Sequence, residues 1–325
     1  MKFNITSILA LLVVLSVLVG PVSAATTWNV TSDNSTSDIQ GVINNAAAGD
    51  TINFTTSAGT IYNGTTGISL RVDRTLTLLG NGVTLIGNGS SIFNITDTSG
   101  VTIRDFIIDI NSTSGGDGIT GSNVNNCVIE NNVITNGDDG INIFMQYNGL
   151  TIRNNTITNM TTGRDGISLV NHNVLENLDS LDPTLIENNI IDDVQYGIFL
   201  GGNFKGNITG NSISATVAGM NITGKKASTN GILNATICNN TINGGIAIES
   251  PTIHFLNLSY NIITGVVAGT ELSIQAAYGY ATGDGVDNIF VTFNEFSNNV
   301  TQRFITDANE TGSWNNNTKN GVPYP

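Results

Sequence analysis

Apolar and polar residues alternate with a period of two in short segments along most of the chain. Seven segments share one pattern: an apolar residue, two variable residues, an Asn, one variable residue and another apolar residue. They are "CVIENNVITN" (127–136), "LTIRNNTITN" (150–159), "TLIENNIIDD" (184–193), "GNITGNSISA" (206–215), "ATICNNTING" (235–244), "LNLSYNIITG" (256–265) and "IFVTFNEFSN" (289–298). This alternation is typical of strands that bury one side. The pattern therefore predicts many short strands and little helix.

The repeat has a shared Asn in the first strand and a second strand soon after it. The shared residues are Asn132, Asn155, Asn189, Asn211, Asn240, Asn261 and Asn294. The second strands are "DGIT" (117–120), "DGINI" (139–143), "DGISL" (165–169), "YGIFL" (196–200), "AGMNI" (218–222), "GGIAI" (244–248) and, more weakly, "AGTEL" (268–272). The shortest spacings between shared asparagines are 21, 22 and 23 residues. Such a unit cannot bury its apolar side alone, so it must stack on copies of itself.

No helical pattern separates the strands, which indicates an all-β parallel β-helix. We expect a solenoid of about nine to eleven coils over residues 37–310, with strands of successive coils about 4.8 Å apart. The recurring Asn is expected to form a structural ladder at a turn where a residue tolerates left-handed backbone geometry.

A short helix is expected to cover the open apolar end of this solenoid. "SDIQGVINNAAAGDTINF" (37–54) begins with Ser37 and Gln40 at capping-box spacing. Apolar residues then fall on one helical side: Ile39, Val42, Ile43, Ala46 and Ala47. Gly49 is a natural stop. A cap of this kind keeps a solenoid from exposing its first coil.

The two ends of the chain differ from the repeats. Residues 1–24 combine Lys2, an apolar run and small residues before Ala25, which predicts a signal peptide cleaved near Ala24. An uncleaved membrane anchor is the alternative. Residues 25–36 are expected to be a linker and 311–325 a polar C-terminal tail. The mature protein is thus expected to be secreted or held at the cell surface.

The composition of the chain limits which classes of partner and modification are expected. The formal net charge is −14, which argues against nucleic acid as a partner. Acceptor sequences for N-glycosylation are frequent, for example at Asn53, Asn63, Asn88, Asn94, Asn111, Asn159, Asn207, Asn221 and Asn257. Cys127 and Cys238 lie four coil steps apart, about 19 Å at the strand spacing, so we expect two unpaired thiols with Cys127 in the core.

The helix lid, the Asn ladder and the repeated Gly-Ile strands resemble the right-handed parallel β-helix repeat proteins of the pectate-lyase-like superfold. The resemblance covers roughly residues 37–310. With its leader, few lysines and much Asn and Thr, the chain is especially similar to adhesin-like surface proteins of methanogenic archaea. This superfold hosts lyases, hydrolases, epimerases, phage tailspikes and non-catalytic adhesins, so it implies no single chemistry.

Aspartates recur where each Gly-Ile strand begins. Asp117, Asp139 and Asp165 are separated by 22 and 26 residues and should stack on one edge, with Asp138 beside them. Polygalacturonases of the same superfold carry one Asp and then an Asp-Asp pair at the start of this strand. That resemblance implies a general acid at Asp138, with Asp117 and Asp139 activating water for inverting hydrolysis, a role that carboxylates about 6.5–9.5 Å apart suit.

The chain departs from the polygalacturonase pattern in three places. Gly115-Gly116 stand where that family has Asn-Thr, and Arg164-Asp165 where it has a His between glycines. The strands "GIFL" (197–200) and "GMNI" (219–222) lack its Arg-x-Lys pair. The departures leave two other interpretations of the aspartates: turn residues that accept backbone hydrogen bonds, or a calcium site that uses Asp117, Asp138, Asp139 and Asp165 as oxygen ligands.

The same strand is expected to present a binding face. Its outward residues are Thr120, Asn142, Ser168, Phe199, Asn221 and Ala247. Connections lengthen at 166–186, 219–237 and 269–291, all at one end of this strand, which is typical of insertions that wall a binding face. Asp165, Asn142, Tyr196 and Phe199 are the candidate binding residues, since exposed aromatic rings stack on sugars.

Three functions are consistent with the sequence. The first is an exported, adhesin-like protein that binds a polysaccharide or surface glycan along this face. The second is a polysaccharide-cleaving enzyme, an inverting glycoside hydrolase or lyase-like protein that uses Asp117, Asp138 and Asp139. The third is a structural component of the cell envelope. The sequence favours the first, because the basic residues that hold acidic sugars are missing.

Overall fold

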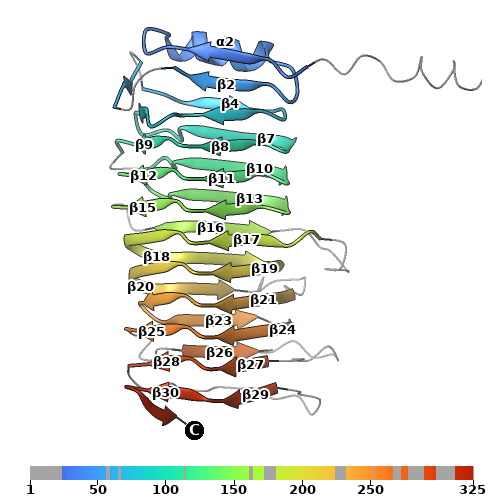
Figure 1. Cartoon of the computed structure of the whole chain (residues 1–325), viewed down its shortest axis with the longest axis vertical. Coiled ribbons are helices and arrows are strands. Elements are labelled where there is room, and N and C mark those ends of the chain that lie inside the picture. The colour runs from blue at the N-terminus through green and yellow to red at the C-terminus, as the bar shows by residue number, and fades with distance from the viewer. Residues whose placement is uncertain are drawn as a thin grey trace, which may run out of the picture.

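The chain forms a single stack of coils (Figure 1), and the expected right-handed parallel β-helix is confirmed. The computed structural model describes residues 24–55, 59–64, 67–112, 115–160, 164–171, 181–223, 232–250, 252–265, 272–276, 289–297 and 312–324. The expected signal peptide therefore lies outside the described residues, Ala24 excepted. No described helix is long and apolar enough to cross a membrane.

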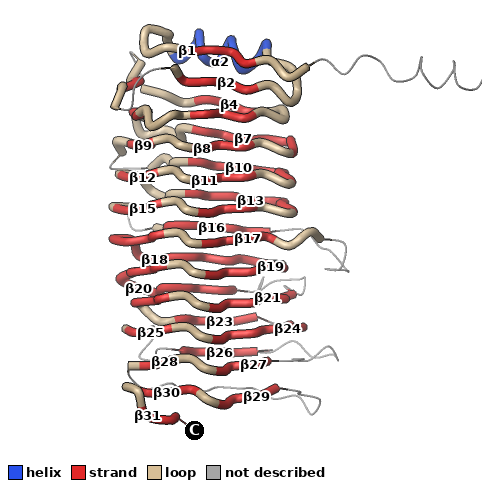
Figure 2. The backbone as a smooth tube through the Cα atoms, viewed as in Figure 1, coloured by secondary structure: helices blue, strands red, loops and turns tan. Residues whose placement is uncertain are grey.

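One side of the stack, face 1, is a parallel sheet of twelve strands within the described part of the chain. These are β1 (Thr27–Val30), β2 (Thr51–Phe54), β5 (Thr77–Leu79), β8 (Thr102–Arg104), β11 (Val128–Glu130), β14 (Thr151–Arg153), β17 (Thr184–Glu187), β19 (Phe204–Thr209), β21 (Ile232–Cys238), β24 (Thr252–Ser259), β27 (Ile289–Thr292) and β29 (Gly312–Asn315). Figure 2 shows these strands lying coil over coil.

The other two sides belong to a second sheet. Face 2 follows the shared Asn and contains β3 (Ile61–Tyr62), β6 (Thr84–Ile86), β9 (Ile107–Asp109), β12 (Val133–Thr135), β15 (Thr156–Thr158), β22 (Thr241–Asn243), β25 (Ile262–Thr264), β28 (Glu295–Phe296) and β30 (Asn317–Lys319). Face 3 contains β4 (Leu70–Val72), β7 (Phe93–Ser99), β10 (Ile119–Asn125), β13 (Ile141–Asn148), β16 (Asp165–Asn171), β23 (Ile246–Ser250) and β26 (Leu272–Ala276). The long strands β18 (Ile190–Gly202) and β20 (Ser212–Thr223) run through both faces.

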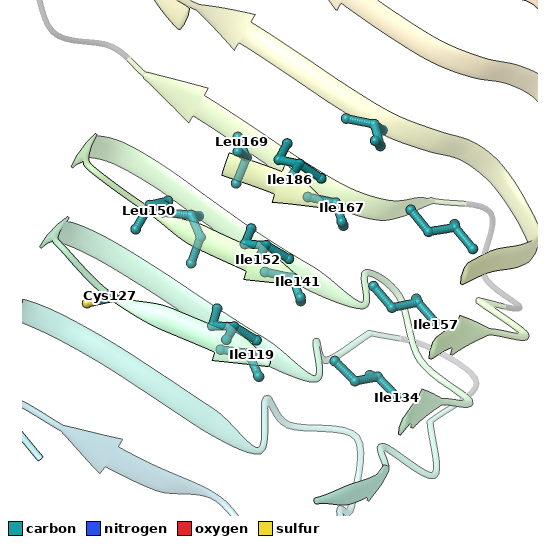
Figure 3. Close-up of a cluster of buried hydrophobic side chains, with 14 of the residues drawn as sticks. Ile119, Cys127, Ile134, Ile141, Leu150, Ile152, Ile157, Ile167, Leu169 and Ile186 are labelled. Carbon is teal, nitrogen blue, oxygen red and sulfur yellow. The ribbon is translucent and has the colours of Figure 1, made fainter. Parts of the chain in front are cut away.

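The core is a set of aliphatic columns that repeat from coil to coil (Figure 3). Ile119, Ile141 and Ile167 are consecutive partners on face 3, and Ile134 pairs with Ile157 on face 2. All five side chains are fully buried. Because the coils share one register, each Ile packs on the Ile above and below it. Burial of this kind contributes about 1.5–3 kcal/mol for each side chain.

The shared asparagines form a continuous ladder of buried side chains. Asn155 shows the unit: its Oδ1 accepts from the backbone N–H and the Nδ2 of Asn132 at 3.0 and 3.1 Å. Its own Nδ2 donates to the carbonyl of Ile129 and to Oδ1 of Asn189. The same rung-to-rung bonds join, in turn, Asn189, Asn211, Asn240, Asn261, Asn294 and the last rung, Asn317.

The left-handed residue of this turn is not the ladder Asn but the residue before it. Asn131, Asn154, Asn188 and Asn239 have φ of 57°, 55°, 54° and 57°. In the remaining coils the left-handed position holds Asp105, Gly210, Tyr260, Phe293 or Asn316. The turn thus contains a left-handed residue, as expected, and the ladder Asn that follows it is held by side-chain bonds in the core.

Helix α2 (Thr36–Asn45) covers the first coil and buries Ile39 and Ile43. Its capping box is made by Ser35 and Asp38, not by the expected Ser37 and Gln40. Ser35 is better placed because its extended backbone lets the side chain accept from the Asp38 N–H. Gln40 instead bonds the backbone of Arg71, which ties the helix to β4.

The solenoid also extends past both expected boundaries. β1 lies within the expected linker and pairs with β2. The expected polar tail contains β29, β30 and β31 (Val322–Tyr324), and Asn317 continues the ladder there. Face 1 consequently has two strands outside residues 37–310. The weak match at 268–272 was also wrong in register, because Leu272 pairs with Ile246 at the start of β26.

Both cysteines are unpaired, as expected. Cys127 is buried in the core (Figure 3), whereas Cys238 is half-buried on face 1. Cys127 lies just before β11 and Cys238 lies on β21, four ladder rungs apart.

Candidate functional site

The aspartate-rich turn between faces 2 and 3 precedes β10, β13 and β16. Gly118, Gly140 and Gly166 each stand directly before the first Ile of these strands. A Cβ on any of them would come within 2.4 Å of an Ile methyl group of face 2. The turn is therefore this tight only with Gly, and the preceding Asp is fixed at the same place in each coil.

Asp117, Asp139 and Asp165 stack on one edge, as expected, and the contacts form a second ladder. Oδ1 of Asp117 accepts from the Asp139 N–H at 3.2 Å, and Oδ1 of Asp139 accepts from the Asp165 N–H at 2.8 Å. Oδ2 of Asp117 accepts from Nδ2 of Asn142 at 3.2 Å. Two of the three carboxyls thus bond the next coil, as the turn-residue interpretation predicts.

Burial sets the charge of this cluster. Asp139 is 3% exposed, and burial raises its pKa to about 8, so its protonated form predominates at neutral pH. Burial raises the pKa of Asp165 to about 6, against the hydrogen bond from Ser168 and the nearby Arg164. Burial also raises the pKa of Asp117, with the negative charge of Asp138 adding to the effect. The cluster therefore holds proton donors and acceptors side by side.

Asp138 differs from the three stacked carboxyls. Its Oδ1 lies 3.5 Å from Nε of Arg164 on the next coil, and Arg164 is largely exposed. The sequence pointed to Arg164 only as a departure from the polygalacturonase pattern. The pairing itself joins side chains of two coils that lie 26 residues apart in the chain, which no residue pattern specifies.

The residues of face 3 that were expected to point outward form one column, in which Thr120 and Ser168 are buried and the other four are half-buried. Thr120, Asn142, Ser168, Phe199, Asn221 and Ala247 are consecutive register partners. A second column beside it contains Phe144, Val170 and Gly201. Phe144 and Val170 were not among the expected outward residues, although each lies two residues beyond such a position and period-two alternation would have indicated both.

Phe144, Val170 and Phe199 make up an apolar patch on this face. Phe144 is exposed, and Val170 and Phe199 are half-buried. A Cβ on Gly201 would lie 3.2 Å from Val170 Cγ1 and 3.4 Å from Phe199 Cε1, so both side chains close over this glycine. Tyr196 is the register partner of Asp165 and is half-buried. All four candidate binding residues, Asp165, Asn142, Tyr196 and Phe199, thus lie on neighbouring coils of face 3.

Two other expectations concern this face. In the part of the chain that the structure describes, no three His, Cys, Asp or Glu side chains are placed to hold a metal ion. The three long connections leave the ends of β16, β20 and β26, which stack on face 3. Most of their own residues lie outside the described ranges.

Comparisons with known proteins agree with the fold. A family model for a right-handed β-helix region matches residues 83–242. No curated protein sequence matches the chain. Among solved structures, a mutant tailspike protein of Escherichia coli bacteriophage HK620, in complex with a pentasaccharide, is similar with a TM-score of 0.51 and 12% identity. The alignment covers 82% of this chain and 54% of the tailspike chain, so this chain spans about half its length.

Two further structures are similar over most of their length. The polygalacturonase from Erwinia carotovora ssp. carotovora is 13% identical over 89% of this chain and 96% of its own, with a TM-score of 0.46. PfbA, a surface adhesin of Streptococcus pneumoniae, is 11% identical over 93% of both chains, with a TM-score of 0.41. At these identities the likeness concerns the fold alone, and polysaccharide-active enzymes, tailspikes and adhesins share that fold.

Proposed function

We propose that this protein is an exported, adhesin-like surface protein that binds a glycan along face 3. The observation that carries this proposal is the apolar patch beside a row of carboxyl and amide groups. Sugar rings pack their C–H side on aromatic and aliphatic groups while their hydroxyls bond planar polar groups. Phe199 and Phe144 supply the first kind of contact, and Asp165, Asn142 and Asp117 the second.

The charge of the site favours a neutral glycan. Asp117, Asp138 and Asp165 surround Arg164, which already pairs with Asp138. A sugar carboxylate placed among these groups would meet more negative than positive charge. The similar tailspike was solved with a pentasaccharide, which fits a glycan partner for the shared fold.

Binding is tested with the mature chain on a panel of neutral and acidic oligosaccharides, by calorimetry. Phe199→Ala should weaken binding about 5- to 150-fold, because stacking on one aromatic ring contributes on the order of 1–3 kcal/mol in comparable sites. Tyr260→Asn removes an exposed aromatic ring far from face 3 and serves as the matched control. Equal affinities for both variants would contradict the proposal.

Export is part of the same proposal and is tested separately. The leader at residues 1–24 should be removed, so that the protein recovered outside the cell begins at Ala25. Amino-terminal sequencing of that protein decides the point. An intact leader on cell-surface protein would indicate the anchor alternative.

A second candidate function, polysaccharide cleavage, rests on the mixed protonation of the aspartate cluster. In it Asp138 would act as the general acid, and Asp117 and Asp139 would activate water. Asp139 is the least suited of the three to activate water, because it is nearly inaccessible to solvent and its Oδ1 accepts a hydrogen bond from the Asp165 N–H. Cleavage would therefore depend chiefly on Asp117 and Asp138, with Asp165 as a further accessible carboxyl.

The two candidates are separated by measuring new reducing ends released from polysaccharides, with and without calcium. Turnover that Asp138→Asn abolishes would support cleavage. Binding without turnover, unchanged in Asp138→Asn, would leave binding as the function.

A further inference from the structure

The turn that builds the Asn ladder also presents a row of exposed asparagines. The left-handed residue that precedes each rung projects from the edge between faces 1 and 2. Asn154, Asn239 and Asn316 hold this position with φ of 55°, 57° and 55°, and all three are exposed. In each case the rung itself is the next residue and is buried: Asn155, Asn240 and Asn317.

Each of these three exposed asparagines is followed, two residues on, by a Thr. The triplets are Asn154-Asn155-Thr156, Asn239-Asn240-Thr241 and Asn316-Asn317-Thr318. Each Thr occupies the first outward position of face 2 and is exposed or half-buried. The two residues that define an N-glycosylation acceptor, the Asn and the hydroxyl residue, thus both reach solvent, while the middle residue anchors the turn in the core.

The three triplets are evenly spaced along the stack. In the chain of ladder bonds, Asn155 and Asn240 are three rungs apart, as are Asn240 and Asn317. Three coil steps correspond to about 14 Å. The edge adjoins faces 1 and 2 but not face 3, so groups attached there leave face 3 open.

Two other acceptor asparagines have their side-chain amide held by a hydrogen bond in the folded chain. Asn53 donates its Nδ2 to Oδ1 of Asn29 at 2.8 Å, and Asn159 donates its Nδ2 to Oδ1 of Asn136. By contrast, Asn239 and Asn316 make one long contact each, to the side chain of the preceding residue, at 3.8 and 3.3 Å. Asn94 and Asn221 lie in the outward column of face 3, where a glycan would cover the proposed binding face.

We propose that Asn154, Asn239 and Asn316 are N-glycosylation sites, which the ladder repeat places along one edge of the solenoid. The inference rests on the proposed export of the chain, since the modifying enzyme acts outside the cytoplasm. The donor class is a lipid-linked sugar phosphate. The bond between sugar C1 and phosphate oxygen breaks, the lipid phosphate leaves with its electron pair, and C1 bonds Asn Nδ2 as one amide proton is lost.

The test exports residues 25–325 behind the signal peptide of a host with an active N-glycosylating transferase, beside a known acceptor protein as control. Peptide mass spectrometry then measures occupancy. We expect a glycan at each of the three sites. Thr156→Val removes one hydroxyl with little change of shape and should abolish the glycan on Asn154 alone. Unmodified Asn154, Asn239 and Asn316 beside a modified control protein would overturn the proposal.

A gain-of-site variant tests whether the edge itself selects the acceptor. Asn188 is exposed and left-handed like the three sites, but Ile190 follows it where they have Thr. Ile190 is 53% exposed, so Ile190→Thr leaves the core intact and should add one glycan on Asn188. No added glycan, with the three natural sites occupied, would overturn the role of the edge. Glycan binding to face 3, measured on the same preparations, reports on the proposed function independently of occupancy.

Discussion

Adjacent asparagines in the repeat have opposite tasks. In "ENNI" (187–190), Asn188 adopts the left-handed backbone and points to solvent, whereas Asn189 is completely buried. Oδ1 of Asn189 accepts from both the N–H and the Nδ2 of Asn155, and its Nδ2 donates to the Ile152 carbonyl. One residue therefore shapes the turn, and the other satisfies buried polar groups of the neighbouring coils.

These roles predict different costs of substitution. Asn189→Ala would leave several buried donors and acceptors without partners, at about 1–3 kcal/mol each, so we expect about 3–5 kcal/mol of lost stability. Asn188→Gly keeps the left-handed geometry and should change stability by less than about 0.5 kcal/mol. Urea unfolding followed by circular dichroism measures both. Similar costs for the pair would contradict the assignment of the two roles.

Asp139 predicts a pH dependence of stability. Its pKa is raised from 3.8 to about 8 in the folded chain, so the folded state holds this proton more tightly than the unfolded state does. The contribution of protonated Asp139 to the free energy of unfolding is fully present below about pH 4. It is lost as pH rises toward 8, with a slope of at most about 1.4 kcal/mol per pH unit. Asp139→Asn mimics the neutral acid and should flatten the slope.

The informative window is pH 6–8, because Asp165, with a pKa of about 6, also contributes below it. The unfolding free energies of the wild type and of Asp139→Asn, each measured at pH 6 and pH 8, give the two pH slopes to be compared. Equal slopes in that window would mean that Asp139 is ionised in the folded chain.

At the scale of the element, the ladder turn tolerates unusual residues when neighbouring coils compensate. Tyr260 and Phe293 hold the left-handed position that Asn holds elsewhere, with φ of 58° in both. Their rings stack with centroids 4.9 Å apart and an angle of 1° between the planes. Stacking of this kind contributes about 0.5–1.5 kcal/mol beyond burial, enough to offset part of the backbone strain.

A double-mutant cycle tests this compensation. Tyr260→Asn and Phe293→Asn each relieve strain but lose the stack, so either change alone should alter stability by less than about 1 kcal/mol. The coupling energy between them should be about 0.5–1.5 kcal/mol. A coupling near zero would show that the rings stack without contributing to stability.

Sequence patterns predicted those elements whose signal repeats in every coil. The Asn rungs, the Gly-Ile strands and the stacked aspartates follow from alternation and spacing, because one register serves the whole solenoid. Patterns failed where a coil is irregular or a signal is short. β1 and β29 have no complete repeat around them, and Leu272 lies two residues beyond the position that the pattern assigned to the partner of Ile246.

The sequence predicted where the candidate site lies, but not the burial or the pairing of its carboxyl groups. Stacking of Asp117, Asp139 and Asp165 followed from their place before Gly-Ile. The burial of Asp139 and the pairing of Asp138 with Arg164 depend on how each turn folds over the next coil. The charge states of these carboxyl groups therefore required the structure.

At the scale of the whole molecule, the solenoid is continuous from cap to last coil. Asp50 joins the cap to the first coil by accepting from the Thr26 N–H, the Trp28 Nε1 and the Ala47 N–H at 2.7–2.8 Å. The ladder then runs unbroken from Asn132 to Asn317. In such stacks each coil contacts only its neighbours, so stability is a sum of coil and interface terms.

The two thiols report on this continuity. Cys238 is half-buried on face 1, whereas Cys127 is 1% exposed and burial raises its pKa. In native buffer at pH 8, a thiol reagent should label Cys238 within minutes and leave Cys127 unreacted, while denatured protein should yield two thiols. Native labelling of Cys127 then requires its coils to open. Labelling of Cys127 is compared with and without Asn189→Ala, both in Cys238→Ser protein. If Asn189→Ala speeds the labelling about as much as it weakens global stability, the solenoid opens as one unit. Faster labelling without any loss of stability would mean that the central coils open locally.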